Sequence, residues 1–244
     1  MKSILVIGCE GSLGRSLVNY LAVRGYLVAG IDRAEVKANP SPLVKYVQAD
    51  VSVAENCFEA MSQCLDELGK IEGVVNLCGE IFSGAVLDFA SSSARHTHSF
   101  DKWAQVLNAN LNTAFNVTMS AIDLFLASRS RGVIVNFSST SAKGNRGQLA
   151  YGVAKAGVEI LTKTCAVELG KLGIRCVAIA PGYINVNSTM SSLSEPIKEN
   201  ILREIPVGKF GATESVNHMV VSVLENEYLN GQVLTLDGGL TAFA

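Results

Sequence analysis

The sequence predicts an α/β fold in which helices cover both faces of a parallel sheet. Short β-branched runs alternate along the chain with longer helical stretches. The first run, residues 3–7 (SILVI), is almost continuously apolar, as expected for a strand that is buried on both faces. A glycine-rich turn follows this run and leads into a helix. Strands that alternate with helices favour right-handed crossovers, and ligands of such sheets bind beyond the carboxyl ends of the strands.

The order of these elements predicts one domain over residues 1–244, because no internal repeat, low-complexity tract or long linker divides the chain. The expected strands are residues 3–7, 27–31, 43–47, 73–77, 133–137, 174–180 and 233–236. The expected helices are residues 13–24, 53–68, 100–127 and 149–169. Pro40 and Pro42 lie between the second and third strands, so we expect any helix there to be short.

Composition excludes several classes of protein. Apolar residues make up 48% of the 244 residues and charged residues 17%, which excludes a disordered chain and suggests that partner subunits cover some surface. The net charge of −2 lacks the basic excess of a nucleic-acid-binding protein, and no apolar run approaches the ~20 residues of a membrane span. The six cysteines form no CxxC motif, and no secretion signal is evident. We therefore expect a cytoplasmic protein with reduced thiols, no metal site, and neither nucleic acid nor membrane as a partner.

A candidate phosphate-binding turn follows the first strand. Residues 8–14 (GCEGSLG) place glycines in the turn and at the start of a helix. Glycines let the backbone approach a pyrophosphate closely, and the helix N-terminus supplies unpaired N–H groups. The candidate contacts are Gly8, Gly11, Ser12, Leu13 and Gly14. The alternative interpretation is a tight structural turn.

Polar residues at the ends of the next strands extend this candidate site. Asp32 ends the second strand, where a carboxylate accepts hydrogen bonds from the ribose hydroxyls of NAD and repels the 2′-phosphate of NADP. Arg33 follows it and keeps NADP possible. Asp50, followed by Val51, is a candidate acceptor for the adenine amino group or, equally, a helix N-cap.

The fourth strand ends in a segment with two further candidates, Asn76 and Gly79. Gly79 allows close approach to a cofactor. Asn76 can tie neighbouring strands together.

Four residues form a candidate proton-transfer site. Tyr151 and Lys155 are four positions apart and share a helix face, Ser138 follows the fifth strand, and Asn110 lies in a predicted helix. A phenol with a pKa of ~10 is a poor base near neutrality, but an ammonium and a cationic nicotinamide both favour the phenolate. Lowering that pKa by ~3 units requires ~4 kcal/mol of differential stabilisation. Ser138 can bond the substrate oxygen as charge develops, and Asn110 can hold a water that links Lys155 to solvent.

Ser139 competes with Ser138 for the role of the site serine. Neighbouring side chains at a strand end point apart, so only one of the two faces the site. The residues alone leave both serines as candidates.

Together, these motifs resemble the short-chain dehydrogenase/reductase family over nearly the whole chain. The resemblance includes the residues above, the terminal segment 236–239 (LDGG) and the Pro181–Gly182 pair. It implies a Rossmann-type, doubly wound domain with a seven-stranded parallel sheet, and a Ser-Tyr-Lys site supported by an Asn. The family spacing between this serine and Tyr151 selects Ser138 over Ser139. The resemblance also implies that Pro181, Gly182 and Ile184 contact the cofactor, that residues 183–210 form a lid, and that helices 100–127 and 149–169 build a homotetramer.

The sequence departs from the family pattern at several positions. The glycine spacing is GxxGxxG, so Ser12 stands where the shorter family members have a glycine. Val186 stands where a Thr commonly contacts the nicotinamide amide, and Asn185, Asn187 or Ser188 are possible substitutes. Residues 88–98 form an insert near the expected substrate mouth.

The resemblance implies an NAD(P)-dependent oxidoreductase that interconverts a secondary alcohol and a ketone. The segment 144–148 (GNRGQ) is similar to the 3-oxoacyl-acyl-carrier-protein reductases, which favours a 3-oxoacyl or 3-hydroxyacyl thioester as the small-molecule or acyl-carrier substrate. A hydroxysteroid, a polyol or another small secondary alcohol stays an alternative. A non-catalytic NAD-binding regulator is the alternative from a different class, although Tyr151 and Lys155 are both present.

Overall fold

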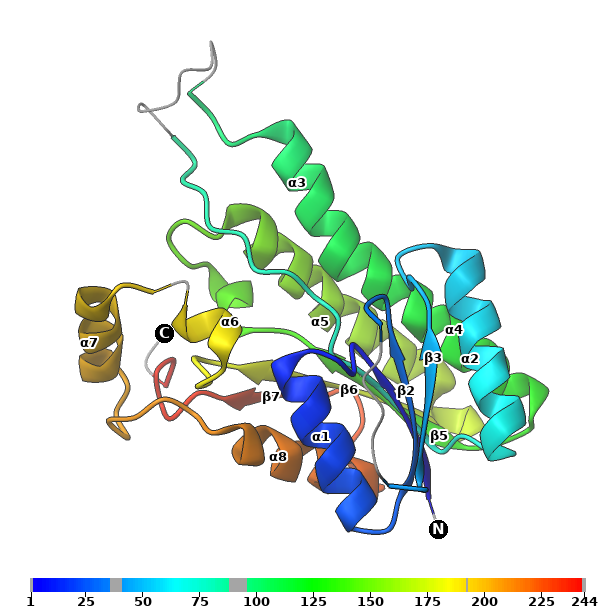
Figure 1. Cartoon of the computed structure of the whole chain (residues 1–244). Coiled ribbons are helices and arrows are strands. Elements are labelled where there is room, and N and C mark those ends of the chain that lie inside the picture. The colour runs from blue at the N-terminus through cyan, green and yellow to red at the C-terminus, as the bar shows by residue number, and fades with distance from the viewer. Residues whose placement is uncertain (1, 36–40, 88–95, 192, 243–244) are drawn as a thin grey trace.

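Seven parallel strands form the sheet in a computed structural model that describes residues 2–35, 41–87, 96–191 and 193–242, without the side chain of residue 188. Figure 1 shows the sheet, whose order is β3-β2-β1-β4-β5-β6-β7. The strands are β1 (Ser3–Ile7), β2 (Leu27–Asp32), β3 (Val44–Gln48), β4 (Gly73–Asn76), β5 (Gly132–Phe137), β6 (Ile174–Pro181) and β7 (Val233–Leu236). Strand order reverses between β1 and β4, where sheets of this kind bind ligands. The predicted α/β class and all seven predicted strands are confirmed, with ends that agree within one residue.

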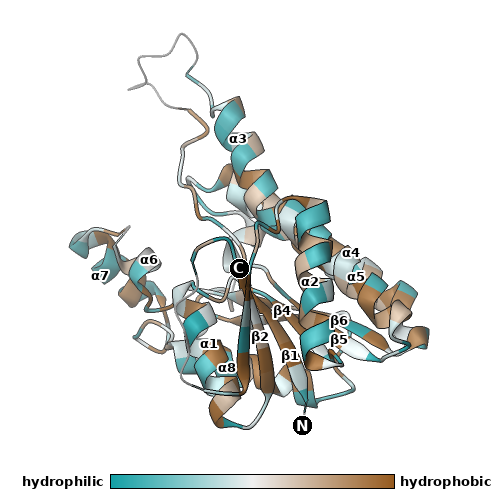
Figure 2. Cartoon of the chain, turned by 45° about the vertical axis from the view of Figure 1, so that its right-hand side comes forward, coloured by the Kyte–Doolittle hydropathy of each residue, from teal (hydrophilic) through white to brown (hydrophobic). Residues whose placement is uncertain are grey.

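Helices cover both faces of this sheet. They are α1 (Ser12–Val23), α2 (Ala54–Leu68), α3 (Phe100–Leu107), α4 (Thr113–Ala127), α5 (Leu149–Leu169), α6 (Asn187–Met190), α7 (Glu195–Glu204) and α8 (Thr213–Glu225). Alternate residues of β1 serve the two faces: Ile4 and Val6 pack under α1 and α8, whereas Leu5 and Ile7 pack under α2, α4 and α5. Figure 2 shows the apolar strands between these two helical layers.

The helical structure departs from the sequence prediction at several points. Helix α8 follows a helical spacing of buried residues, Val216, Val220 and Val223, yet it is not among the predicted elements. The predicted helix over residues 100–127 has the right extent, but a π-helical turn, Asn108–Asn112, divides it into α3 and α4. Pro40 and residues 88–95 lie outside the described residues, so the predictions made there stay predictions.

The glycine turn brings α1 very close to the end of β1. Gly8 has a φ of +80°, a left-handed conformation that favours glycine. A Cβ atom at Gly14 would lie 2.1 Å from the carbonyl oxygen of Gly8 and 2.7 Å from the Cα of Cys9. Gly14 is therefore required for packing, whereas a Cβ at Gly11 would meet its nearest atom at 3.4 Å.

We predict that Gly14→Ala lowers the free energy of unfolding by about 3 kcal/mol, because the methyl group forces α1 away from β1. Gly11→Ala is the matched control, and we expect it to change the same quantity by less than about 1 kcal/mol. Urea unfolding without cofactor measures both. Equal stabilities of the two variants would contradict the close packing at Gly14.

Candidate active site

Two adjoining cavities open beyond the carboxyl ends of the strands. The β2 cavity, of about 490 Å³, is lined by the ends of β2 and β3, including Asp32, Arg33, Asp50 and Val51. The β5 cavity, of about 760 Å³, is lined by the ends of β5 and β6 and the start of α5. Predicted residues on its wall are Ser12, Leu13, Gly14, Ser138, Tyr151, Lys155, Pro181, Gly182 and Ile184. Gly8, Gly11 and Gly79 line both cavities, so the glycine turn joins them.

The start of α1 faces the β5 cavity with its first turn uncapped. Gly11 occupies the N-cap position and supplies no side-chain hydrogen bond, and no acidic residue lies in the first turn. The first N–H groups of a helix lack intrahelical partners and carry partial positive charge. This end of α1 can therefore accept an anionic group such as a pyrophosphate.

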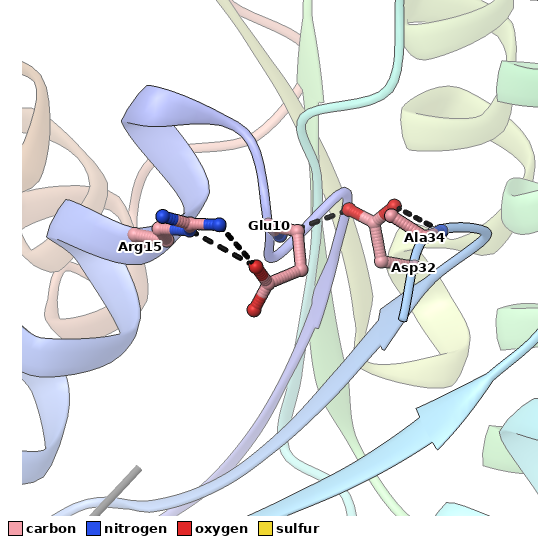
Figure 3. A network of polar contacts seen from close by, with 4 residues as sticks. All are labelled: Glu10, Arg15, Asp32 and Ala34. Carbon is pink, nitrogen blue, oxygen red and sulfur yellow. Dashed lines mark hydrogen bonds and ion pairs between the residues drawn. The ribbon is translucent and has the colours of Figure 1, made fainter. Parts of the chain in front are cut away.

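Asp32 is fixed by two backbone groups at the edge of the β2 cavity. One carboxylate oxygen accepts a hydrogen bond from the Glu10 N–H at 2.9 Å, and the other accepts one from the Ala34 N–H at 3.0 Å (Figure 3). Its orientation is thus set by the glycine turn before any ligand arrives.

Asp50 stands at the other side of this cavity but does not cap α2, whose N-cap is Val53. Its carboxylate instead accepts hydrogen bonds from the N–H and hydroxyl of Ser52, at 3.0 and 2.7 Å. These bonds hold the pKa of Asp50 below its usual value. The carboxylate is therefore an ionised acceptor at neutral pH.

Tyr151 and Lys155 lie buried on one side of the β5 cavity. The Lys155 ammonium donates to the Phe137 carbonyl at 2.9 Å and lies 5.6 Å from the centre of the Tyr151 ring. Burial raises the pKa of Tyr151 to about 12 and lowers the pKa of Lys155 to about 8. The chain's own residues therefore keep the phenol protonated, and the lowered phenol pKa expected from the sequence is not found among them. Burial therefore sets the pKa of this phenol, since it outweighs the lowering effect of Ser139.

The two adjacent serines point in different directions. The Ser138 hydroxyl donates to the Glu159 carboxylate at 2.8 Å and to the Lys155 carbonyl at 3.2 Å, so it ties the end of β5 to α5. The Ser139 side chain lies near enough to the Tyr151 phenol to lower its pKa, although burial outweighs this effect, and its hydroxyl donates to the Ser141 hydroxyl at 3.2 Å. The spacing argument favoured Ser138, but the geometry favours Ser139 as the serine beside the phenol. Side-chain direction at the strand end decides this, and residue spacing does not contain it.

Asn110 lies in the π-helical turn and is fully buried. Its side-chain amide donates to the carbonyls of Glu80 and Val106, both at 2.9 Å. A Cβ atom at Gly79 would lie 2.6 Å from the Asn110 Oδ1 and 3.1 Å from the Lys155 Nζ. The absence of a side chain at Gly79 thus lets Asn110 and Lys155 approach the same point.

Asn76 lies beneath the cavities and not on their walls. It is buried, and its Oδ1 accepts a hydrogen bond from the Cys78 N–H at 3.1 Å. This contact braces the turn after β4 and argues against direct contact with a cofactor, whereas the strand-tying role of Asn76 stays a prediction.

Sequence reasoning missed the hydroxyls of Ser83 and Thr189 on the β5 cavity wall, of which Thr189 lies in α6. Thr189 lies three residues after Val186, which also lines the cavity. The segment that holds both is anchored at its ends, because Ile184 pairs with Gly211. The sequence contains one signal for Thr189. The family commonly has a threonine at the position of Val186, and Thr189 follows that position by about one helical turn.

All six cysteines have free thiols, and within the described residues no helix is both long and apolar enough to span a bilayer.

Comparison with known proteins identifies the family. Residues 8–241 match the family described as Enoyl-(Acyl carrier protein) reductase. The 3-oxoacyl-acyl-carrier-protein reductase FabG of Staphylococcus aureus is 31% identical over 98% of both chains, and that of Thermotoga maritima is 32% identical over 98% of this chain and 97% of its own. A short chain dehydrogenase from Bacillus anthracis superposes with a TM-score of 0.86 at 25% identity, covering 98% of this chain and 96% of that one. The chain belongs to the short-chain dehydrogenase/reductase family of oxidoreductases.

Proposed function

We propose that this enzyme interconverts a 3-oxoacyl and a 3-hydroxyacyl thioester with a nicotinamide cofactor, NAD in preference to NADP. One observation carries the proposal: the buried Tyr151 phenol shares a cavity wall with a serine hydroxyl and with Lys155, one helical turn away, beside an uncapped helix start. Such an arrangement supplies a proton donor and an anion site at one edge of the sheet.

The residues that line the cavities fit a dinucleotide. Gly8 and Gly11 leave the backbone of the turn accessible, and the start of α1 suits a pyrophosphate. Asp32 suits the ribose hydroxyls of an adenosine, while Asp50 and Val51 suit its adenine. Pro181, Gly182 and Ile184 would hold the nicotinamide end, with Thr189 as the hydroxyl near it. When bound, the cofactor supplies or accepts the hydride.

Tyr151 acts as the general acid in the reducing direction. Because burial raises its pKa to about 12, the phenol is protonated at neutral pH and can donate to the substrate oxygen. Ser139 holds that oxygen through its hydroxyl. Lys155 binds the cofactor ribose and, with its pKa lowered to about 8, returns a proton to the tyrosine. Asn110 positions a water beside Lys155 near Gly79, which links this ammonium to solvent.

The thioester assignment rests on the named relatives and on the cavity wall. Ile81, Val186 and Ile184 supply apolar surface for an acyl chain near Tyr151. The matching family carries an enoyl reductase description, so a crotonyl thioester is the natural control substrate beside an acetoacetyl thioester. Residues 183–210 serve as the lid of this single domain, and the enzyme works in the cytoplasm.

We also propose that the enzyme assembles as a homotetramer through α4 and α5. Helices α4 and α5 present exposed apolar side chains that no other described element covers, among them Phe115, Val153, Ile160 and Val167. Val153, Ile160 and Val167 follow one face of α5 at seven-residue intervals. Association through these two helices would bury this surface.

Tyr151→Phe tests the reaction. We expect kcat for reduction of acetoacetyl thioester to fall about 10³-fold, because the proton donor is gone, while NADH binding measured by fluorescence persists. Crotonyl thioester should remain unreduced by the wild-type enzyme. Unchanged turnover in the variant would exclude the proposed acid, and a wild type active only on crotonyl thioester would make it an enoyl reductase.

The two serines give opposite expectations. Ser139→Ala should lower kcat/KM about 10²-fold, since the oxygen of the substrate loses its donor. Ser138→Ala should lower the free energy of unfolding by about 1 kcal/mol and reduce kcat/KM far less. Steady-state kinetics and urea unfolding of both variants measure this. A larger kinetic loss for Ser138→Ala would restore Ser138 as the site serine.

Light scattering tests the assembly. We expect the mass of a tetramer for the wild type and a smaller species for Ile160→Asp, because a charge on the α5 face opposes its burial. Val23→Asp, on an exposed valine at the end of α1, is the matched control and should keep the tetramer. A monomeric wild type would contradict the proposal.

A further inference from the structure

An ion pair lies beside the glycine turn and has no part in the function proposed so far. Arg15, in the first turn of α1, donates to a single carboxylate oxygen of Glu10 through Nε at 3.0 Å and through Nη2 at 2.5 Å. The Glu10 side chain is only 8% exposed, whereas that of Arg15 is 51% exposed. Figure 3 shows the Glu10 carboxylate directed toward Arg15 and its backbone toward Asp32. A nearly buried carboxylate is thus held in one place by an arginine from the next helix.

The pair belongs to the same network as Asp32. The Glu10 N–H donates to Asp32 at 2.9 Å, so the position of one carboxylate depends on the residue that bears the other. Glu10 lines both cavities and therefore stands at their junction, whereas Asp32 lines the β2 cavity. A nucleotide that extends from one cavity to the other passes Glu10.

The charges of the β2 cavity oppose an additional phosphate. Its described lining residues include four carboxylates, Glu10, Asp32, Asp50 and Glu80, and one guanidinium, Arg33. Arg15 is not among these lining residues, and its guanidinium is engaged by Glu10. Carboxylates accept hydrogen bonds from ribose hydroxyls, but they repel a phosphate dianion at short range. Specificity of this kind comes from repelling the wrong ligand as much as from binding the right one.

We propose that the Glu10–Arg15 pair determines cofactor specificity by excluding an adenosine ribose that carries a 2′-phosphate. Glu10 supplies the repelling charge. Arg15 holds that carboxylate at the turn, offsets part of its charge and is itself withheld from phosphate. This inference rests on the proposed binding of a nicotinamide nucleotide, and it assigns to Glu10 and Arg15 a part of the selectivity that Asp32 alone would otherwise explain.

Binding measurements on matched variants test the pair. The Kd values of NADH and NADPH are measured by fluorescence, and those of ADP and 2′,5′-ADP by calorimetry, so that no turnover is needed. For Glu10→Gln, the ratio of the NADPH Kd to the NADH Kd should fall about 5- to 10-fold, because a repelling charge is lost and Arg15 is released. The 2′,5′-ADP to ADP ratio should fall in parallel, and the change should shrink at high ionic strength.

Arg15 supplies the second variant, which leaves the buried Glu10 in place. Arg15→Met should raise the NADPH to NADH ratio, since the Glu10 charge loses its counter-ion, and Arg15→Lys should restore much of the wild-type ratio. Glu59→Gln, which removes an exposed carboxylate on α2, is the charge-matched control and should leave the ratio unchanged.

Two failures can be told apart. A ratio that stays constant in both Glu10→Gln and Arg15→Met, or equal changes in both affinities, would overturn the role of the pair while cofactor binding stands. A wild type that binds neither nucleotide would overturn the proposed function and this inference with it.

Discussion

The buried ammonium of Lys155 holds the active-site edge of the molecule together. A charge or a donor that is removed from water must find a partner inside the protein, and Lys155 finds the Phe137 carbonyl at the end of β5. The main chain of the same residue is tied to the same strand end, because the Lys155 carbonyl accepts from the Ser138 hydroxyl. Two bonds from one residue thus fix the register of α5 against β5. That register places Tyr151, one turn earlier, beside Ser139, the next residue after the anchoring serine.

The β2 cavity depends on a steric constraint at the glycine turn. Gly14 lets α1 start against the Gly8 carbonyl, and the turn that results points the Glu10 N–H at Asp32. The carboxylate at the end of β2 is thereby fixed through the backbone of the turn that would hold a pyrophosphate. Under the proposed function, phosphate binding and ribose recognition would share one short segment, and a change in its conformation would alter both. The Gly79 backbone, which lines both cavities, connects this segment to Lys155 and Asn110.

The sequence predicts the sheet well because each buried strand is a short β-branched run that ends at a turn. Helix periodicity also gives the extent of residues 100–127, but a period of 3.6 does not contain the extra residue of the π-helical turn. That turn arises from tertiary contacts, in which the Asn110 amide reaches the Glu80 carbonyl. The candidate site, too, is predicted from the sequence only in part. Residue types and spacing locate Tyr151 and Lys155, whereas the choice between Ser138 and Ser139 depends on side-chain direction, which spacing leaves open.

Burial of the phenol has a consequence for the direction of the reaction. With its pKa raised to about 12, Tyr151 is protonated at neutral pH, so it carries the proton that reduction of a ketone consumes, although it is a weaker acid than a free phenol. Reduction of a ketone needs that donor, so the protein without cofactor is prepared for the reducing direction. Oxidation of an alcohol needs the phenolate, yet burial keeps the phenol protonated even though Lys155, with a pKa of about 8, is still mostly an ammonium at neutral pH. The further positive charge must come with an oxidised nicotinamide, which favours the phenolate when it binds nearby. The redox state of the cofactor therefore decides the protonation state that the reaction uses, and the buried Tyr–Lys pair responds to it.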